Sequence, residues 1–378
     1  MTAGPAGPGR RIRVAVIGGD GIGPEVTAAT LPVLAAAAAL DGAVVDAEQL
    51  DWGGDRYLRT GQAMPGDGPE LLRGFDGVLF GAVGRPDVPD HELIWGLILA
   101  LRQRLGLALN LRPAQFWPGA RSPLARPDGI DLLIVRENTE GEYAGIGGRS
   151  QQGRPGEVAI EVAVHSRAVI EKIARFSFER ARRRRGGLAL VTKSNVLRYG
   201  YTLWDEVTAQ VAADYPDVTC EVVLADAMAA RLVERPAGLD VLLCGNLFGD
   251  VLSDLACSLT GGLGLAPSAN VPYDRSAPGV YEPVHGSAPD IAGRGIANPC
   301  ACALSAAMLA DDLDLPRAAG AIRAAVAATL ARPGERTPDV GGTATTAGVA
   351  AALLARVTGA GSGGTAASGG VTAERRSS

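Results

Sequence analysis

The sequence predicts an α/β protein of two domains, and three observations lead to this prediction. Short apolar runs alternate with longer amphipathic or alanine-rich segments along almost the whole chain, as in α/β folds. The chain has 378 residues, more than the ~250–300 that one hydrophobic core usually organises. Hydrophobic residues make up 47% of the chain and charged residues 20%, which is typical of soluble globular enzymes.

Strands are expected where β-branched apolar residues alternate or run together over a few positions. These stretches lie at residues 11–17, 78–80, 132–135, 158–164, 188–191, 219–224 and 241–244. Helices are expected where the spacing of apolar residues is helical. These segments run from the glycine turn at 18–23 to about residue 40, and over 93–105, 166–184, 247–258, 296–309 and 315–330, with a loop at 84–90.

Composition narrows the location and the partners. A net charge of −5 argues against nucleic acid as a partner. No run reaches the ~18 apolar residues of a membrane span, and residues 1–9 lack the pattern of a signal peptide, so we expect a cytoplasmic protein. The five cysteines form no CxxC pair and are expected to be reduced. Residues 1–9 and 359–378 are expected to be disordered tails, because they are rich in small residues without periodicity.

A glycine motif, GGDGIG at residues 18–23, follows the first predicted strand. Its spacing is not the G-x-G-x-x-G of dinucleotide-binding folds, and no convincing ribose-binding acid follows at the right distance. The motif fits a tight strand-to-helix turn as well as a phosphate-binding loop.

Two aspartates, Asp250 and Asp254, lie four residues apart on a predicted helix, so their carboxylates share one face. Like charges at this spacing repel each other unless a cation lies between them. Asp226, after the preceding strand, can supply a third oxygen ligand. A set of carboxylates without His or Cys favours Mg²⁺ or Mn²⁺, the alternative being charges on an exposed helix face.

Three arginines, Arg102, Arg112 and Arg136, interrupt apolar stretches. Guanidinium groups bind carboxylates through paired hydrogen bonds, so a cluster of them suits a dicarboxylate; structural salt bridges are the alternative. Lys193, one of two lysines in the chain, and Tyr143 are candidates for proton transfer.

The segment 282–299, EPVHGSAPDIAGRGIANP, is rich in small residues that let a nucleotide approach the backbone. Asp290 can accept hydrogen bonds from a ribose diol, and no nearby Lys or Tyr is available for a 2′-phosphate. The segment therefore favours NAD over NADP.

Taken together, these motifs resemble the β-decarboxylating dehydrogenases, the family of isocitrate, isopropylmalate, homoisocitrate and tartrate or D-malate enzymes. The resemblance covers residues 11 to about 357. It depends on the ordered motifs GDGIGPEV (19–26), NLRP (110–113), VRENTEGEY (135–143), TKSN (192–195), NLFGDVLSDL (246–255) and EPVHGSAPDIAG (282–293).

The resemblance implies an isopropylmalate-dehydrogenase-like two-domain fold that is not a Rossmann fold, so the glycine motif becomes a structural turn. Residues 10–107 and 261–358 would form the cofactor-binding domain, and 108–260 the domain for substrate, metal and dimerisation. The implied dimer shares its active sites, with Lys193 and Asp226 serving the partner's site.

The resemblance also implies roles for single residues. Tyr143, Lys193 and Asp226 would be catalytic, and Asp226, Asp250 and Asp254 would hold Mg²⁺ or Mn²⁺. Arg102, Arg112, Arg136, Trp95 and Ile98 would bind substrate. NAD would contact Asn195, Glu282, His285, Gly286, Ser287, Ala288, Asp290, Ile291 and Asn298.

The substrate is suggested by the run before Arg102, LIWGLILALR, which lacks the serine and asparagine that isocitrate enzymes use for a third carboxylate. The pattern WG-x-x-L, with DWGGDRYL (51–58), resembles tartrate or D-malate enzymes, and a bulky Trp95 suits a small substituent. A 3-isopropylmalate dehydrogenase is the alternative, and a non-catalytic regulatory member is a lesser one. Without the resemblance, a two-domain small-molecule binding protein would be the competing class.

Overall fold

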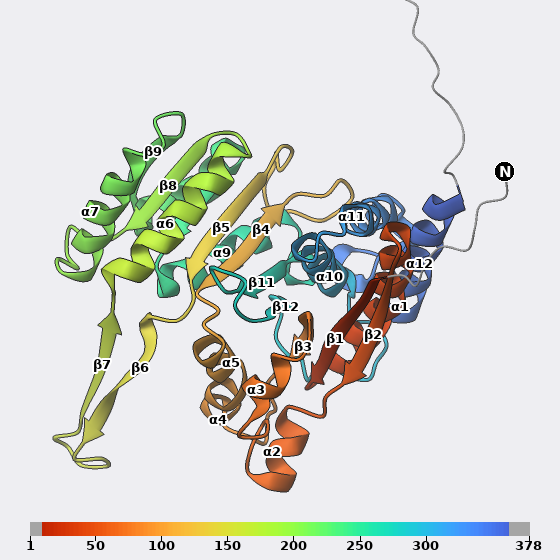
Figure 1. Ribbon diagram of the computed structural model, residues 1–378, viewed down its shortest axis with the longest axis horizontal. Coiled ribbons are helices and arrows are strands. Elements are labelled where there is room, and N and C mark those ends of the chain that lie inside the picture. Colours follow the sequence, from red (N-terminus) through yellow and green to blue (C-terminus); the bar gives the residue numbers. More distant parts are fainter. Residues whose placement is uncertain (1–9, 363–378) are drawn as a thin grey trace, which may run out of the picture.

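The computed structural model describes residues 10–362, and a mixed ten-stranded sheet runs through this part of the chain (Figure 1). Its strand order is β2-β1-β3-β12-β11-β4-β5-β10-β8-β9. Neighbouring strands are parallel except around β11 and β4, where the pairs β12–β11, β11–β4 and β4–β5 are antiparallel. The strands are β1 (Arg10–Gly19), β2 (Ala43–Gln49), β3 (Gly77–Ala82), β4 (Leu109–Gln115), β5 (Asp131–Glu137), β8 (Gly187–Thr192), β9 (Thr219–Leu224), β10 (Val241–Cys244), β11 (Pro267–Val271) and β12 (Gly279–Pro283).

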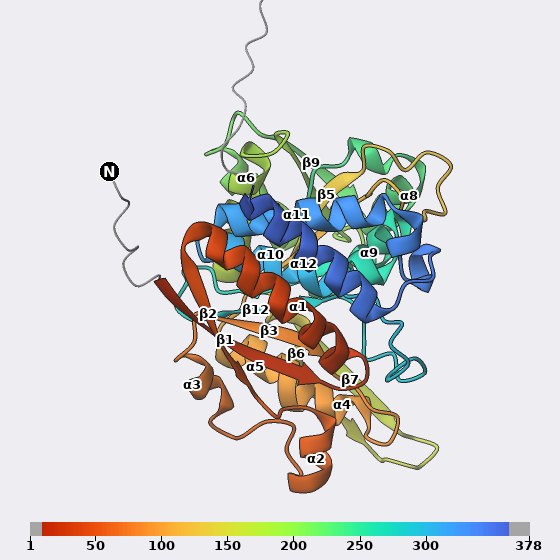
Figure 2. The same ribbon diagram turned by 90° about the vertical axis from the view of Figure 1, so that its right-hand side faces the viewer.

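Helices pack against both halves of this sheet. In the half that contains β1, β2 and β3, α1 packs with α10, α11 and α12 in one layer (Figure 2). In the other half, α6 contacts β5, β8 and β10, while α9 contacts β4 and β5. The helices are α1 (Gly23–Ala38), α2 (Gly54–Thr60), α3 (Gly68–Leu72), α4 (Asp90–Leu93), α5 (Leu99–Arg104), α6 (Arg167–Arg182), α7 (Gly200–Ala212), α8 (Ala225–Glu234), α9 (Asn246–Thr260), α10 (Cys300–Asp312), α11 (Pro316–Leu330) and α12 (Thr346–Ser362).

Alternation along the strands separates the two faces of the sheet. Leu133 and Val135 of β5 pack in one core cluster with α6 and α7, whereas Leu132 and Ile134 pack in another with α8 and α9. This is the period of two expected of a strand covered on both faces. The side of the sheet that α9 covers is called the front face below.

The strand order divides between β11 and β4. Strands on one side of this point come from residues 10–107 and 261–358, and those on the other from 108–260. The sheet itself is continuous across the boundary, so a division into two domains at these residues remains a proposal.

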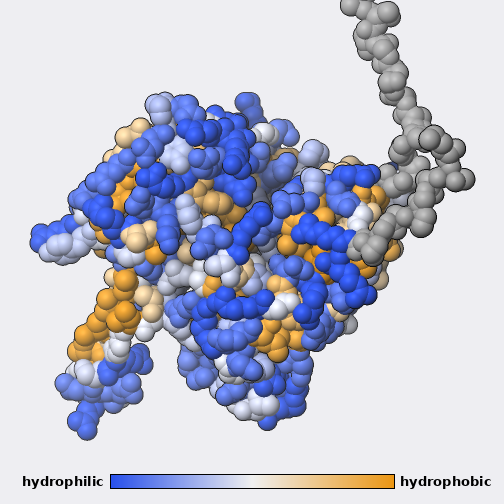
Figure 3. Space-filling view, viewed as in Figure 1, coloured by the Kyte–Doolittle hydropathy of each residue, from blue (hydrophilic) through white to orange (hydrophobic). Residues whose placement is uncertain are grey.

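A two-stranded arm, β6 (Gly141–Ser150) paired with β7 (Val158–Val164), projects from the body of the protein (Figure 1). Ile146, Val158, Ile160 and Val162 on the arm are between 39% and 60% exposed. Figure 3 shows this apolar surface along the arm. A two-stranded ribbon with exposed apolar side chains is marginal alone, so the arm has the character of a contact surface.

One described helix, Gly23–Asp41, is long and apolar enough to cross a membrane. This helix contains Glu25 and Asp41, so it is not the uninterrupted run of ~18 apolar residues that the sequence was predicted to lack. The helix packs against β1, β3, α10, α11 and α12, as core helices of globular proteins do, and this contact explains its apolar character.

Several predicted elements differ from the structure for local reasons. The helix predicted at 93–105 is divided into α4, a π-helical segment (Ile94–Ile98) and α5. The helix predicted from 296 begins at Cys300, where Asn298 accepts a hydrogen bond from the Cys300 amide at 3.0 Å. Helix α12 continues to Ser362, into the segment expected to be disordered, while residues 1–9 and 363–378 lie outside the described residues.

Candidate active site

Three arginine side chains meet on the front face of the sheet, in a cleft of about 330 Å³. Arg102 comes from α5, Arg112 from β4 and Arg136 from β5. Their side chains are 9%, 8% and 2% exposed, respectively. The structure thus brings together the three arginines that the sequence marked.

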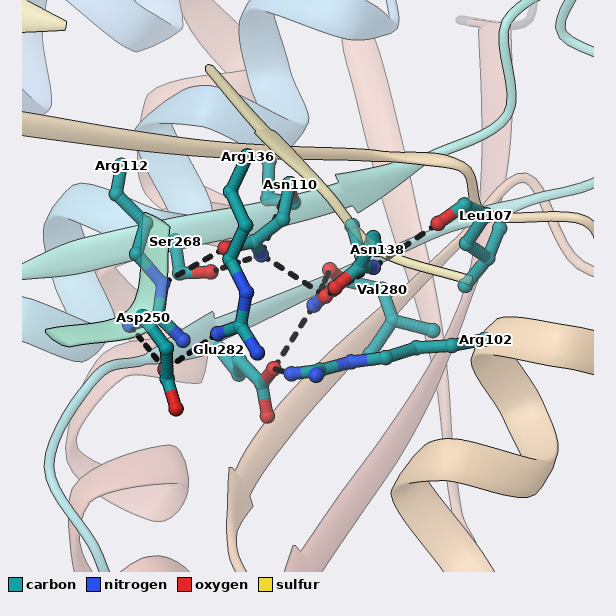
Figure 4. A network of polar contacts seen from close by, with 12 residues as sticks. Arg102, Leu107, Asn110, Arg112, Arg136, Asn138, Asp250, Ser268, Val280 and Glu282 are labelled. Atoms are coloured by element: carbon teal, nitrogen blue, oxygen red, sulfur yellow. Dashed lines mark hydrogen bonds and ion pairs between the residues drawn. The ribbon is translucent and has the colours of Figure 1, made fainter. Parts of the chain in front are cut away.

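A hydrogen-bond network holds these guanidinium groups in place (Figure 4). Arg112 donates from Nε to Asn110 at 2.7 Å and from Nη1 to Ser253 at 2.7 Å. Arg136 donates from Nε to Asn246 at 2.9 Å, and Arg102 donates to Glu282 at 3.2 Å. Each guanidinium group is thus oriented by hydrogen bonds to neutral or acidic acceptors, as a preorganised anion site requires.

The positive charges are crowded. Burial, together with repulsion from Arg112, lowers the pKa of Arg136 to about 9. Burial also lowers the pKa of Arg102, although Glu282 opposes this effect. Arg102 Nε is buried without a hydrogen-bond partner among the described residues. Because burial and mutual repulsion disfavour the charged forms of Arg102 and Arg136, an anion bound beside them would stabilise those forms.

Asp250 faces the arginines from α9. Its Oδ1 accepts from Arg136 and lies 3.0 Å from Arg112 Nη1, and Tyr143 donates to its Oδ2 at 3.1 Å. Burial raises the pKa of Asp250, but the two arginines outweigh burial and leave that pKa lowered. Burial and the charge of Asp250 raise the pKa of Tyr143, so its hydroxyl keeps its proton at neutral pH.

Asp254, one helical turn later, lies 3.3 Å from Arg112 Nη1, and its side chain is 55% exposed. Burial raises its pKa, and the charge of Asp250 adds to this effect while Arg112 opposes it. The helix therefore presents two carboxylates on one face, as predicted, with incomplete compensation from the arginines.

Lys193 and Asp226 form a separate pair on the surface of the same half. Lys193 Nζ donates to Asp226 Oδ1 at 2.6 Å, and their side chains are 26% and 69% exposed. The hydrogen bond from Lys193 is the main cause of the lowered pKa of Asp226. Neither residue lines the cleft of the arginines.

The predicted metal ligands do not converge within one chain. Among the described residues, no group of three His, Cys, Asp or Glu side chains could hold a metal ion. Asp250 and Asp254 supply two carboxylates, fewer than a hard divalent cation takes from protein and water together. These donors fit Mg²⁺ or Mn²⁺ if further oxygen ligands come from elsewhere.

Apolar side chains also line the cleft and form what is called the apolar wall. It consists of Val83, Ile94, Ile98 and Leu99. Ile98 and Trp95 were expected to contact the substituent of the substrate. Ile98 lines the cleft, whereas Trp95 is not among the residues that line the cleft and is 40% exposed.

The loop expected to bind the cofactor borders the same cleft. Glu282, His285 and Gly286 line it. Burial lowers the pKa of His285, and its buried Nε2 has no hydrogen-bond partner among the described residues. Gly286 faces open space. An unpartnered ring nitrogen beside open backbone fits a nucleotide placed along this loop.

Other residues expected to bind NAD lie farther along the loop or elsewhere. The cleft lining does not include Ser287, Ala288, Asp290, Ile291, Asn298 or Asn195. Asn298 donates to Asp339 at 3.0 Å, and Ala288 has a left-handed φ of 41°. Asn195 follows Lys193 on the exposed surface of the other half.

The glycine motif is a close-packed turn. A Cβ at Gly21 would lie 1.9 Å from the carbonyl oxygen of Ser287, and the Ile22 amide donates to that same oxygen at 2.8 Å. Asp20 accepts from the amides of Gly54 and Gly84 at 2.8 and 3.0 Å. The motif therefore positions the loop at 284–291 through backbone contact.

Several residues that orient the site were missed from the sequence. Asn110 precedes Arg112 by two residues on the same face of β4, and Asn246 precedes Asp250 by four on α9. Their spacing matches the period of a strand and of a helix, so an amide at that distance from a marked residue was an available signal. Ile94 also lines the cleft and could have been found in the same way, because it precedes Ile98 by four residues and Arg102 by eight.

The chain is similar to known proteins over most of its length. A family profile described as isocitrate/isopropylmalate dehydrogenase matches residues 13–353. A probable tartrate dehydrogenase/decarboxylase of Agrobacterium vitis is 46% identical, over 93% of this chain and 99% of the relative. A 3-isopropylmalate dehydrogenase of Mycolicibacterium paratuberculosis is 46% identical, over 86% of this chain and 96% of the relative. The crystal structure of isocitrate dehydrogenase from Methylococcus capsulatus superposes with a TM-score of 0.84 at 35% identity, covering 92% of this chain and 99% of that one.

Proposed function

Because the chain belongs to the isocitrate/isopropylmalate dehydrogenase family, we propose that it oxidises tartrate or D-malate with NAD⁺ and Mg²⁺ or Mn²⁺, with or without loss of CO₂. The observation that carries this proposal is the crowding of Arg102, Arg112 and Arg136 in one small cleft. Relatives named as tartrate dehydrogenases/decarboxylases are 42–46% identical to the chain.

The cleft favours a dicarboxylate of few carbons. Arg112 and Arg136 offer donors on one side, and Arg102 offers donors from α5. The wall formed by Val83, Ile94, Ile98 and Leu99 is apolar, so it provides no partner for a third carboxylate such as that of isocitrate, and an unpaired buried charge there would be unfavourable.

Two proton carriers belong to this chain. Tyr143 holds its proton on the hydroxyl, which donates to Asp250 at 3.1 Å, and it is the proposed donor of a proton to the carbanion formed by decarboxylation. Lys193, held by Asp226, is the proposed acceptor of the proton from the substrate hydroxyl. Its amine can lose a proton when desolvated, which a guanidinium cannot do.

Asp250 and Asp254 would hold the divalent cation, together with Asp226 of a second copy. When bound, such an ion supplies a Lewis acid that makes the hydroxyl more acidic and stabilises negative charge on oxygen. The incomplete neutralisation of Asp254 supports this assignment, because burial and Asp250 raise its pKa.

The loop at 282–298 would hold NAD⁺, which supplies the hydride acceptor. Glu282, His285 and Gly286 lie nearest the arginines. We assign Ser287, Ala288, Asp290, Ile291 and Asn298 to the adenosine half.

We propose that the site is completed in a homodimer. The pair Lys193–Asp226 and the pair Asp250–Asp254 do not meet within one chain, although both stand on the half formed by 108–260. The same half carries exposed Val196, Tyr199 and Val251, at 63%, 77% and 59%, in addition to the apolar arm. Exposed apolar side chains of this kind mark protein contact surfaces.

The alternative is 3-isopropylmalate. It is favoured by Ile94, Ile98 and Leu99, which would pack against an isopropyl group, and by a relative of that name at 46% identity. A non-catalytic regulatory role has less support, because Tyr143, Lys193 and the three aspartates are all present.

The test is a comparison of kcat/KM for D-malate, L-tartrate, meso-tartrate and 3-isopropylmalate with NAD⁺ and Mn²⁺. We expect D-malate or a tartrate to give the highest value. A preference for 3-isopropylmalate would establish the alternative, and no turnover with any of the four acids would reject both.

A further inference from the structure

The helical segment from Asp90 to Arg104 presents two neighbouring rows of side chains. Ile94, Ile98 and Arg102 form one row, and all three line the cleft. Trp95, Leu99 and Gln103 form the next row, one position further along. Residues four apart on a helix share a face, so the side chains of the second row lie next to those of the first on the helix surface.

The second row contacts strand β6 in the other half of the sheet. Gln103 Nε2 donates to the carbonyl oxygen of Tyr143 at 3.4 Å. Two residues later, a Cβ built on Gly145 would lie 2.6 Å from Cη2 and 2.9 Å from Cζ3 of Trp95. Real Cβ atoms essentially never approach another atom within 3.0 Å, so this position of the indole requires glycine at 145.

Strand β6 is irregular where this contact occurs. Its pairing with β7 shifts register between Gly141 and Ile146, and Gly145 has a left-handed φ of 71°. Tyr143 lies in the same irregular stretch, and its hydroxyl bonds to Asp250. The Trp95–Gly145 contact therefore joins the two halves of the protein next to the proposed proton donor.

We propose that Trp95, seated on Gly145, closes the mouth of the cleft and that the missing side chain at 145 makes the enzyme select small substrate substituents. This inference rests on the proposed function and deepens it. The indole contacts Gly145 of the other half, and Trp95 directly follows Ile94, a residue of the cleft lining, in the sequence. A bulkier substituent at the apolar wall pushes the α4–α5 segment outward and separates the ring from its seat.

Gly145→Ala tests this directly, because the added Cβ displaces the ring. We expect kcat/KM for D-malate to fall ~10-fold or more, since small displacements at a closing site are costly to rate. We expect the ratio of kcat/KM for 3-isopropylmalate over D-malate to rise ~10-fold, the scale of apolar pocket discrimination.

The arm supplies matched controls. Gly153 has a φ of 72° and open space around it, so Gly153→Ala reproduces the backbone strain without the collision. Gly148→Ala adds a methyl group in open space at an ordinary φ. Both variants should keep the wild-type substrate ratio. If Gly145→Ala changes all substrates equally, or no more than Gly153→Ala does, the proposal is rejected.

A double-mutant cycle covers the case in which Gly145→Ala folds poorly. Trp95→Leu removes the ring but keeps an apolar side chain, and it should raise the substrate ratio by itself. Adding Gly145→Ala to Trp95→Leu should then change the ratio little, because no ring remains to be displaced. Additive effects of the two substitutions, or an unchanged ratio in Trp95→Leu, would contradict the contact's role.

A fluorescence measurement separates this inference from the proposed function. The other three tryptophans are Trp52 and Trp204, which are 6% and 1% exposed, and the half-buried Trp117, against 40% for Trp95. The acrylamide quenching lost in Trp95→Phe therefore measures Trp95 by difference. Gly145→Ala should increase that quenching about twofold, whereas Gly153→Ala should not. This result stands even if no hydroxy acid is turned over. Turnover of D-malate together with unchanged quenching and an unchanged substrate ratio would reject the inference alone.

Discussion

Lys193→Ala and Asp254→Asn each remove one half of the proposed shared site, so a dimer made of one copy of each should regain activity. Lys193 takes no part in the arginine network, and Asp254 contributes one contact, with Arg112 Nη1 at 3.3 Å. Lys193 bonds to Asp226 on the surface, and Asp254 is 55% exposed with Asp250 still available to Arg112. Asp250→Asn would be a less specific change, because Asp250 contacts Arg112, Arg136 and Tyr143.

The structure sets the expected magnitudes. Lys193–Asp226 is an exposed ion pair, and such pairs contribute little to stability, so Lys193→Ala should fold normally and lose turnover. In the mixed dimer, one site has both residues intact and the other has lost both. Its activity should therefore be about half that of the wild-type dimer, given two-fold symmetry with equivalent sites.

The assay is co-expression of the two variants with different affinity tags, two-step purification, and measurement of NADH formation with D-malate and Mn²⁺. Each homodimeric variant is the inactive control, and native mass spectrometry verifies the composition. A pure mixed dimer without activity would show that Lys193 and Asp254 serve the same chain's site, and the shared-site argument would fail.

Three further predictions follow from the site and its surroundings. Arg136→Lys keeps the charge but removes the guanidinium group that contacts both Asn246 and Asp250. Because a hydrogen bond to a charged group contributes ~1.5–3 kcal/mol, kcat/KM should fall ~10–100-fold. The exposed control Arg149→Lys should retain wild-type kcat/KM. EDTA should abolish turnover and Mn²⁺ should restore it; full activity after EDTA dialysis would contradict the metal assignment. His165 accepts a hydrogen bond at Nδ1 from Trp204 at 3.1 Å, and burial lowers its pKa. As the pH falls through the ordinary histidine range near ~6.5, the unfolded state therefore binds a proton before the folded state does, and stability is lost below that range. His165→Gln should reduce the difference in Tm between pH 7.5 and 5.5. The control His91→Gln, at an exposed position, should leave that difference unchanged.

Residues whose placement depends on a regular period could be predicted from the sequence. Asp250 and Asp254 share a face because they lie one helical turn apart, and the parallel strands β5, β8 and β10 followed from short apolar runs. Strand β6 was missed, since its sequence GEYAGIGGRS is rich in glycine, which weakens the strand signal.

Contacts between distant segments could not be predicted in the same way. The spacing of Asp226 from Asp250 does not say whether the two carboxylates meet within a chain or between copies. Trp95 was expected to bind substrate, whereas the structure places its indole against Gly145, and no pattern along the sequence links these two distant residues. A contact of this kind depends on how the two halves of the sheet are arranged, which residue spacing does not reveal.

The arginines show why a charge inside an apolar strand predicted a site. In the antiparallel pair of β4 and β5, Asn110 lies opposite Arg136, and Arg112 opposite Ile134. Leu111 and Leu133, the alternate residues, belong to the core on the other face. A slip of one residue would turn both guanidinium groups into that core and expose the leucines. The packing that fixes the register of these two strands therefore also fixes the positions of the arginines. A strand can carry arginines at these positions because the face on which they lie borders a cleft and not the closed core.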